Sequence, residues 1–124
     1  MKLINNFLCG VQVAAFAEAL AMVERGGLDR AVALGLLTGG APGSPLVRAM
    51  AERMSAPVPV EPQFHLELMA KDLAYARSEA ASAGLELRTA GAALERFSAA
   101  VDAGLGSRDL SAVVEPLRGE VKSS

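Results

Sequence analysis

The first 25 residues constrain the fold of this chain more than any other segment. They contain no proline and one glycine, and only two of the first 23 residues are charged, Lys2 and Glu18. Such a run predicts a single long helix over residues 1–25, which Gly26 and Gly27 should end. Because a helix that is apolar on nearly all sides has to be buried on nearly all sides, we expect it at the centre of a bundle or in an interface.

Proline, glycine and capping residues divide the rest of the chain into further helices. Three prolines exclude a helix from residues 55–63. Ser44 followed by Pro45 is a strong helix start, because the hydroxyl can cap the first turn and proline lacks an N–H that would go unbonded there. The predicted helices cover residues 30–37 behind Asp29, 45–54, 64–83, 89–104 and a short turn behind Asp109 that Pro116 should kink or end, with a loop over 38–43.

Alanine and leucine dominate the composition, and both residues favour helices. Strand-like alternation is confined to residues 85–87, and the chain contains no internal repeat or low-complexity tract. The sequence therefore predicts an all-α fold, a compact bundle of about six helices around the long N-terminal one. We expect one domain over residues 1–120 and a frayed tail over residues 121–124.

Charge and cysteine content argue against several classes of function. The formal net charge is −2 with both signs mixed along the chain, so the basic face of a nucleic-acid-binding protein is missing. The single cysteine, Cys9, can form neither an internal disulfide nor a zinc site. A reducing cytoplasm is the simplest compartment for such a chain. We therefore expect a cytoplasmic protein without nucleic-acid or metal partners.

The apolar N-terminal run also has the general look of a secretory signal or a membrane anchor. Asn5, Asn6 and Gln12 interrupt the part where a signal needs its apolar core. The uncharged stretch over residues 3–17 is shorter than the roughly 20 residues that span a bilayer. A buried core helix is the preferred interpretation, with no membrane partner. Since the mean hydropathy of +0.31 is high for a soluble monomer, we expect a homodimer or a larger homo-oligomer.

One cluster of polar residues opens the long helix. Lys2, Asn5 and Asn6 stand three and four residues apart, a spacing that places their side chains on one face. Amides at the head of such an apolar helix need hydrogen-bond partners if they are buried. On spacing alone, however, a solvated helix start is the simpler interpretation.

A second cluster lies in the helix expected to begin at Phe64. Lys71 and Asp72 are neighbours in sequence and therefore point to different sides of that helix. Taken by pattern alone they are ordinary surface charges. A lone histidine near the start of a helix, such as His65, is usually solvated or hydrogen-bonded locally, and we do not assign it a catalytic role.

Together these clusters belong to a longer resemblance. Five segments in order resemble signatures of the β-hydroxyacid dehydrogenase family, which includes 3-hydroxyisobutyrate dehydrogenase, tartronate semialdehyde reductase and the glyoxylate/succinic semialdehyde reductases. Similarity to this family implies a helical C-terminal domain, like that of 6-phosphogluconate dehydrogenase, that packs against a Rossmann domain and contributes half of the active site. The segments, which span Lys2 to about Leu117, are residues 2–6, 17–20, 27–29, Phe64 with 71–73, and 104–106 with 109–112.

The resemblance also implies roles for individual residues. The lysine of the family's KxxxN motif falls on Lys2 and acts there as general acid/base, while the asparagine falls on Asn6, which orients the lysine and contacts the substrate. Phe64 corresponds to a position beside the substrate. Lys71 and Asp72 correspond to the cofactor side of the cleft, with Asp72 close to the catalytic group. A glutamate that recurs in the family falls on Glu18, which we interpret as a structural, helix-buried acid in need of a partner.

By this resemblance the chain is the C-terminal domain of an NAD(P)-dependent oxidoreductase that interconverts a small β-hydroxyacid and its semialdehyde or oxo acid. NAD or NADP would be bound mainly by the Rossmann domain. The nearest match to a Gly-rich dinucleotide turn, Gly104-x-Gly106-x-x-Asp109, has the wrong last residue and lies between two helices. Met1 therefore looks like a boundary inside a longer protein, and the chain alone should be inactive. The alternative is a stand-alone helical module for binding or dimerisation, without redox activity.

Overall fold

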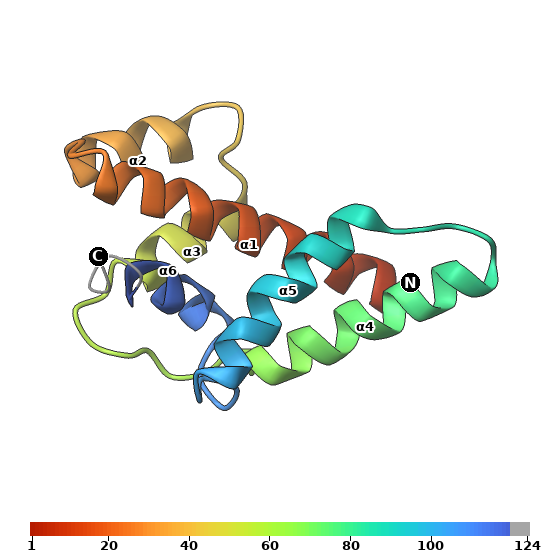
Figure 1. Cartoon of the computed structure of the whole chain (residues 1–124). Coiled ribbons are helices and arrows are strands. Elements are labelled where there is room, and N and C mark those ends of the chain that lie inside the picture. Colours follow the sequence, from red (N-terminus) through yellow and green to blue (C-terminus); the bar gives the residue numbers. More distant parts are fainter. Residues whose placement is uncertain (120–124) are drawn as a thin grey trace.

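The computed structural model describes residues 1–119, and over these residues the fold is all-α (Figure 1). The predicted bundle of about six helices is confirmed, with one additional 3-10 turn. The central helix is α1, which packs against every other helix and against the 3-10 turn. The elements are α1 (Lys2–Arg25), α2 (Arg30–Gly39), α3 (Pro45–Met54), α4 (Leu66–Ser82), α5 (Arg88–Asp102), the 3-10 turn η1 (Leu110–Val114) and α6 (Glu115–Gly119).

Helix α1 is as long as predicted, but it is not buried on nearly all sides. Ala17 and Leu20 are fully buried, whereas Ile4, Leu8 and Met22 are 56%, 53% and 76% exposed. Only 39% of its most apolar stretch is buried within the described chain. The expectation of nearly complete burial is therefore wrong for the chain by itself, because the other helices cover only part of the circumference of α1.

Length and composition alone would also allow α1 to cross a membrane, and it is the one helix among residues 1–119 of which this is true. Core helices of soluble proteins and signal sequences meet the same criterion. The packing of α1 against every other element is the behaviour of a core helix.

The predicted starts of α2 and α3 are confirmed by their caps. The Asp29 carboxylate accepts from the Val32 N–H at 3.0 Å, and the Ser44 hydroxyl accepts from the Val47 N–H at 3.1 Å. Helix α2 runs two residues further than predicted. Thr38, expected in the loop, stays helical, and its hydroxyl donates to the Leu34 carbonyl at 2.7 Å.

Helix α4 begins two residues later than predicted, so Phe64 lies outside it. The Phe64 carbonyl accepts from Leu110 N–H at 2.8 Å, which ties the segment before α4 to the segment before η1. The first N–H groups of α4 also bond outside the helix: Leu66 N–H donates to the Arg108 carbonyl and Glu67 N–H to the Gly106 carbonyl, both at 2.9 Å. Pairing with residues 106–110 thus replaces the first helical turn predicted from sequence.

Helices α4 and α5 form a long hairpin on one side of α1 (Figure 1). Gly84, with φ of +79°, allows the turn that ends α4. At its other end α5 stops at Asp102, and Gly104 has the left-handed conformation expected of a helix terminator.

The next elements, η1 and α6, lie where the sequence predicts a short helix behind Asp109. The predicted cap is confirmed, because the Asp109 carboxylate accepts from Ser111 N–H at 3.1 Å at the start of η1. The turn behind Asp109 ends at Val114, just ahead of Pro116, as predicted. Pro116 itself lies in the first turn of α6, where its missing N–H costs no hydrogen bond. The tail predicted over residues 121–124 lies outside the described residues.

Candidate active site at the α1–α4 contact

The structure brings the two polar clusters of the sequence together. The Asn6 side-chain amide donates to the Asp72 carboxylate at 2.6 Å, across 66 residues of sequence, in a partly buried position. A hydrogen bond to a charged acceptor is stronger than one between neutral groups, so this contact fixes the orientation of the Asn6 amide. Asn6 and Asp72 therefore form one structural unit.

Close approach of α1 and α4 makes this contact possible. Gly10, one turn after Asn6 on α1, is buried against α4. A Cβ atom at this position would lie 2.8 Å from the Met69 Sδ and 3.2 Å from a Leu73 methyl carbon. Glycine thus removes the side chain that would otherwise hold the two helices apart next to the Asn6–Asp72 pair.

Lys2 lies one turn before Asn6, at the open end of α1. Its side chain is exposed, and within residues 1–119 the ammonium group has no ion-pair partner. Asn5 is also exposed and donates weakly to the Asn6 side-chain oxygen at 3.4 Å. The described chain therefore positions Asn6 and Asp72 but does not enclose the Lys2 side chain.

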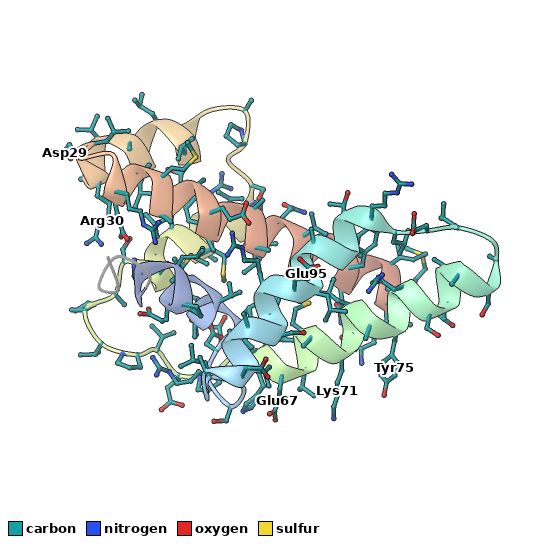
Figure 2. All side chains as sticks on the ribbon, in the orientation of Figure 1. Asp29, Arg30, Glu67, Lys71, Tyr75 and Glu95 are labelled. Carbon is teal, nitrogen blue, oxygen red and sulfur yellow. The ribbon has the colours of Figure 1, made fainter. Side chains whose placement is uncertain are left out.

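The side chain of Lys71 points in a different direction from that of its neighbour Asp72. Its side chain points away from the bundle, on the same side of α4 as Glu67 and Tyr75 (Figure 2). The spacing of four residues between these three explains their common direction. Lys71 is exposed, so the structure leaves its ammonium group accessible on a different side of α4 from Asp72.

Phe64 is partly buried and packs against the core. It lies just before α4, outside the helix that carries Asp72. The predicted place of Phe64 beside the substrate stays a prediction.

The residue that sequence reasoning undervalued is Asp109, which it treated only as a helix cap. The carboxylate is 2% exposed and accepts from Arg53 Nε at 3.0 Å and from Gln63 N–H at 2.9 Å. It also accepts from the Ser111 hydroxyl at 2.6 Å. Burial by itself would raise the pKa of Asp109, but these hydrogen bonds lower it to about 2. Asp109 thus anchors the segment that carries Phe64, a role that no local pattern indicates.

Glu18 has an ion-pair partner, as expected, but it is not buried as expected. Its carboxylate pairs with Arg96 Nε of α5 at 2.8 Å, and 52% of its side chain is exposed. The prediction of a helix-buried acid is wrong, because Glu18 lies at the rim of the α1–α5 contact.

Comparison with known proteins identifies the family. A family model described as NAD-binding of NADP-dependent 3-hydroxyisobutyrate dehydrogenase matches residues 1–117. Glyoxylate/succinic semialdehyde reductase 1 of Arabidopsis thaliana is 32% identical over 118 residues, which are 95% of this chain and 40% of that protein. L-threonate dehydrogenase of Escherichia coli K12 is 32% identical over 121 residues, 96% of this chain and 39% of that protein. The chain thus spans about two fifths of the length of these relatives.

Solved structures agree with the sequence matches. A 3-hydroxyisobutyrate dehydrogenase from Salmonella typhimurium superposes with a TM-score of 0.86 at 31% identity, covering 92% of this chain and 40% of the other. The Mycobacterium tuberculosis 3-hydroxyisobutyrate dehydrogenase, in a structure with L-serine, gives 0.80 at 29% identity, covering 94% and 42%. The resemblance seen in the sequence is confirmed: the chain belongs to the 3-hydroxyisobutyrate dehydrogenase family of NAD(P)-dependent oxidoreductases.

Proposed function

We propose that this chain forms the helical half of an active site that interconverts a small β-hydroxyacid and its semialdehyde or oxo acid. The observation that carries the proposal is the 2.6 Å hydrogen bond between Asn6 and Asp72, one helical turn from Lys2. It joins two segments, distant in sequence, whose residues match the family's catalytic and cleft positions. In this proposal Lys2 is the general acid/base, and Asn6 positions both the lysine and the substrate.

The proton transfer follows from the chemistry of an alcohol. As the carbinol carbon loses a hydride, its hydroxyl group loses a proton, which the neutral amine of Lys2 accepts; in the reverse direction the ammonium returns it. Asp72 fixes the Nδ2 end of the Asn6 amide. The Asn6 Oδ1 atom is then directed to accept from Lys2 or from the substrate hydroxyl. Asp72 acts through Asn6 in this scheme, as a positioning residue.

A nicotinamide cofactor, when bound, supplies the hydride acceptor or donor. From this chain, the accessible Lys71 ammonium fits an anionic group of such a cofactor, since it is exposed and directed away from the bundle. The remaining contacts are assigned to a nucleotide-binding domain. Docked at the N-terminal end of α1 over Lys2, that domain would exclude water from the site.

The substrate class is supported by the names of the relatives. Those proteins are a glyoxylate/succinic semialdehyde reductase and an L-threonate dehydrogenase. We infer a small acid that carries a hydroxyl or an aldehyde group.

The test is a chimera in which this chain replaces the matching 121 residues of the E. coli L-threonate dehydrogenase. We expect NAD(P)-dependent oxidation of small hydroxyacids. The Lys2→Met variant should lower kcat by roughly 10²–10⁴-fold, because it removes the titrating group and keeps the aliphatic stem. Asn6→Ala should change both kcat and KM. The matched control is Gln12→Ala, which removes an exposed amide of the same helix that bonds only to the Leu8 carbonyl, and it should leave both constants close to those of the parent chimera.

Two results would contradict the proposal. One is a folded chimera that binds the cofactor but turns over no small hydroxyacid. The other is a Lys2→Met chimera with the kcat and the pH profile of its parent.

A further inference from the structure

Asp109 lies where three parts of the fold meet. Its Oδ2 atom accepts from Arg53 Nε of α3 at 3.0 Å and from the Ser111 hydroxyl of η1 at 2.6 Å. Its Oδ1 atom accepts at 2.9 Å from the N–H of Gln63, in the segment before α4. Arg53 also donates, through Nη2, to the Glu61 carbonyl of that segment. The Arg53–Asp109 pair thus ties the segment before α4 to α3 and to η1.

The backbone of Phe64 is held on both sides by this part of the fold. Its carbonyl accepts from the Leu110 N–H at 2.8 Å, and its N–H donates weakly to the Asp109 carboxylate at 3.5 Å. Two residues on, the Leu66 N–H donates to the Arg108 carbonyl at 2.9 Å, so the two segments run antiparallel where α4 begins (Figure 1). The direction of the partly buried Phe64 ring therefore depends on this attachment.

Helix α4 has separate supports further along its length. Leu73 is fully buried and packs against Gly10 of α1. Its neighbour Asp72 accepts from Asn6 of α1 at 2.6 Å. Loosening the segment before α4 should therefore release Phe64 while Asp72 keeps its place.

The Arg53–Asp109 pair is itself buried, with side chains 15% and 2% exposed. Taking two charges out of water costs free energy that their attraction returns only in part, so apolar residues could join these elements equally well. A guanidinium and a carboxylate add direction, because their hydrogen bonds have a fixed geometry. Such a pair suits a task that needs one defined position of the attached segment.

We infer that the Arg53–Asp109 pair positions the Phe64 ring against the substrate. The inference rests on the proposed function and on the place beside the substrate that the family resemblance implies for Phe64. Neither Arg53 nor Asp109 contacts the substrate in this scheme, so both are positioning residues. The ring forms an apolar wall for the carbon chain of the acid. Its displacement should weaken substrate binding and leave the proton transfer at Lys2 unchanged.

A double-mutant cycle in the L-threonate dehydrogenase chimera tests the inference. Arg53→Met should raise the KM for the hydroxyacid roughly tenfold, while kcat and the KM for the cofactor stay within about twofold of the parent values. Phe64→Leu should raise the KM for the hydroxyacid by a similar factor. The double variant should have the KM of Phe64→Leu alone, because the pair then has no ring left to position.

Arg53→Lys keeps the test open if the methionine variant does not fold. Lysine retains a cation opposite the carboxylate but lacks the fork that also reaches the loop carbonyl. We expect a smaller rise in KM, again only while Phe64 is present. The matched control is Glu24→Gln, which breaks a partly buried ion pair with Arg118 at 2.9 Å and should lower the melting temperature without changing KM.

Amide hydrogen exchange of the 124-residue chain gives a readout that needs no turnover. In the Arg53→Met chain, the N–H groups of Leu66 and Leu110 should exchange at least about tenfold faster than in the parent. The N–H of Phe97, fully buried in α5, should change much less. Equal acceleration at all three positions would indicate general destabilisation and would overturn the inference.

Two kinetic results would also overturn it. One is an active Arg53→Met chimera with the KM of its parent. The other is a double variant in which the two KM factors multiply, as expected of a merely structural role. A parent chimera without turnover would overturn the proposed function and the inference with it, whereas an active parent separates the two.

Discussion

Replacing Asp109 with Asn should remove most of the stability that the ionised Asp109 carboxylate gives the folded chain and that the chain loses in acid. The substitution keeps the size of the side chain, but it removes the charge that faces Arg53 at 3.0 Å and replaces one accepting oxygen with a donating NH2 group. Since the Asp109 carboxylate is 2% exposed, solvent hardly screens this interaction. The variant should therefore be less stable than the parent chain at neutral pH.

The magnitude follows from the pKa of Asp109. A fall from 3.8 in the unfolded chain to about 2 in the folded chain corresponds to about 2.5 kcal/mol of stabilisation. The folded-state pKa is the lower one, so the stabilisation is complete above pH 4 or so. It is lost as the pH falls through the window between about 4 and 2.

Urea unfolding followed by circular dichroism, at pH values from 7 down to about 2, measures this effect. The quantity to compare is the difference in unfolding free energy between the parent and the Asp109→Asn chain, because other carboxyl groups then cancel. The difference should shrink by about 2 kcal/mol between pH 5 and pH 2. A difference that is the same at both ends of the range would refute the assignment of the low pKa to Asp109.

Four further results are expected. Calorimetry of the isolated chain should detect no NADH or NADPH binding at micromolar concentrations, because it lacks a phosphate-binding turn; saturable binding would contradict the assignment of the cofactor to another domain. Gly43→Ala should destabilise the chain by roughly 1–3 kcal/mol, since its Cβ would lie 2.0 Å from the Thr38 carbonyl oxygen. Gly91→Ala has only the flexible Arg77 side chain nearby, so it should stabilise the chain by roughly 0.5–1 kcal/mol in the same urea assay. Glu18→Gln should cost less than about 1 kcal/mol by that assay, because its pair is half exposed.

The helices could be predicted from sequence wherever their ends are set by local chemistry. Asp29 and Ser44 cap the helices they precede, as expected, because a cap involves only the next three residues. The start of α4 was placed too early for the opposite reason. Its first N–H groups bond to residues 106–108, about 40 positions away, and no local signal reports such a partner.

The site was predictable as a set of residues but not as a geometry. The motif spacing placed Lys2 and Asn6 on one face of a helix, and the resemblance added Asp72. That Asn6 donates to Asp72 depends on how α1 and α4 lie against each other and on the space left at Gly10. Helical periodicity defines the buried side of each helix but not how one helix slides along another. The pairing had to come from the fold.

The exposure of α1 and α2 also shows how an apolar pattern should be interpreted in this family. The apolar run of α1 was expected to be buried, yet the helices of this chain leave both of its ends partly open. The two ends differ in chemistry. The N-terminal end carries Lys2 and two amides on one side of the helix and exposed Ile4 and Leu8 on the opposite side. Near the C-terminal end, the charged Asp29 and Arg30 stand next to exposed apolar residues. The polar side of the N-terminal end suits a reacting ligand between domains. In the chimera, Lys2→Met should therefore lower kcat while the helix content and the cofactor affinity stay close to those of the parent.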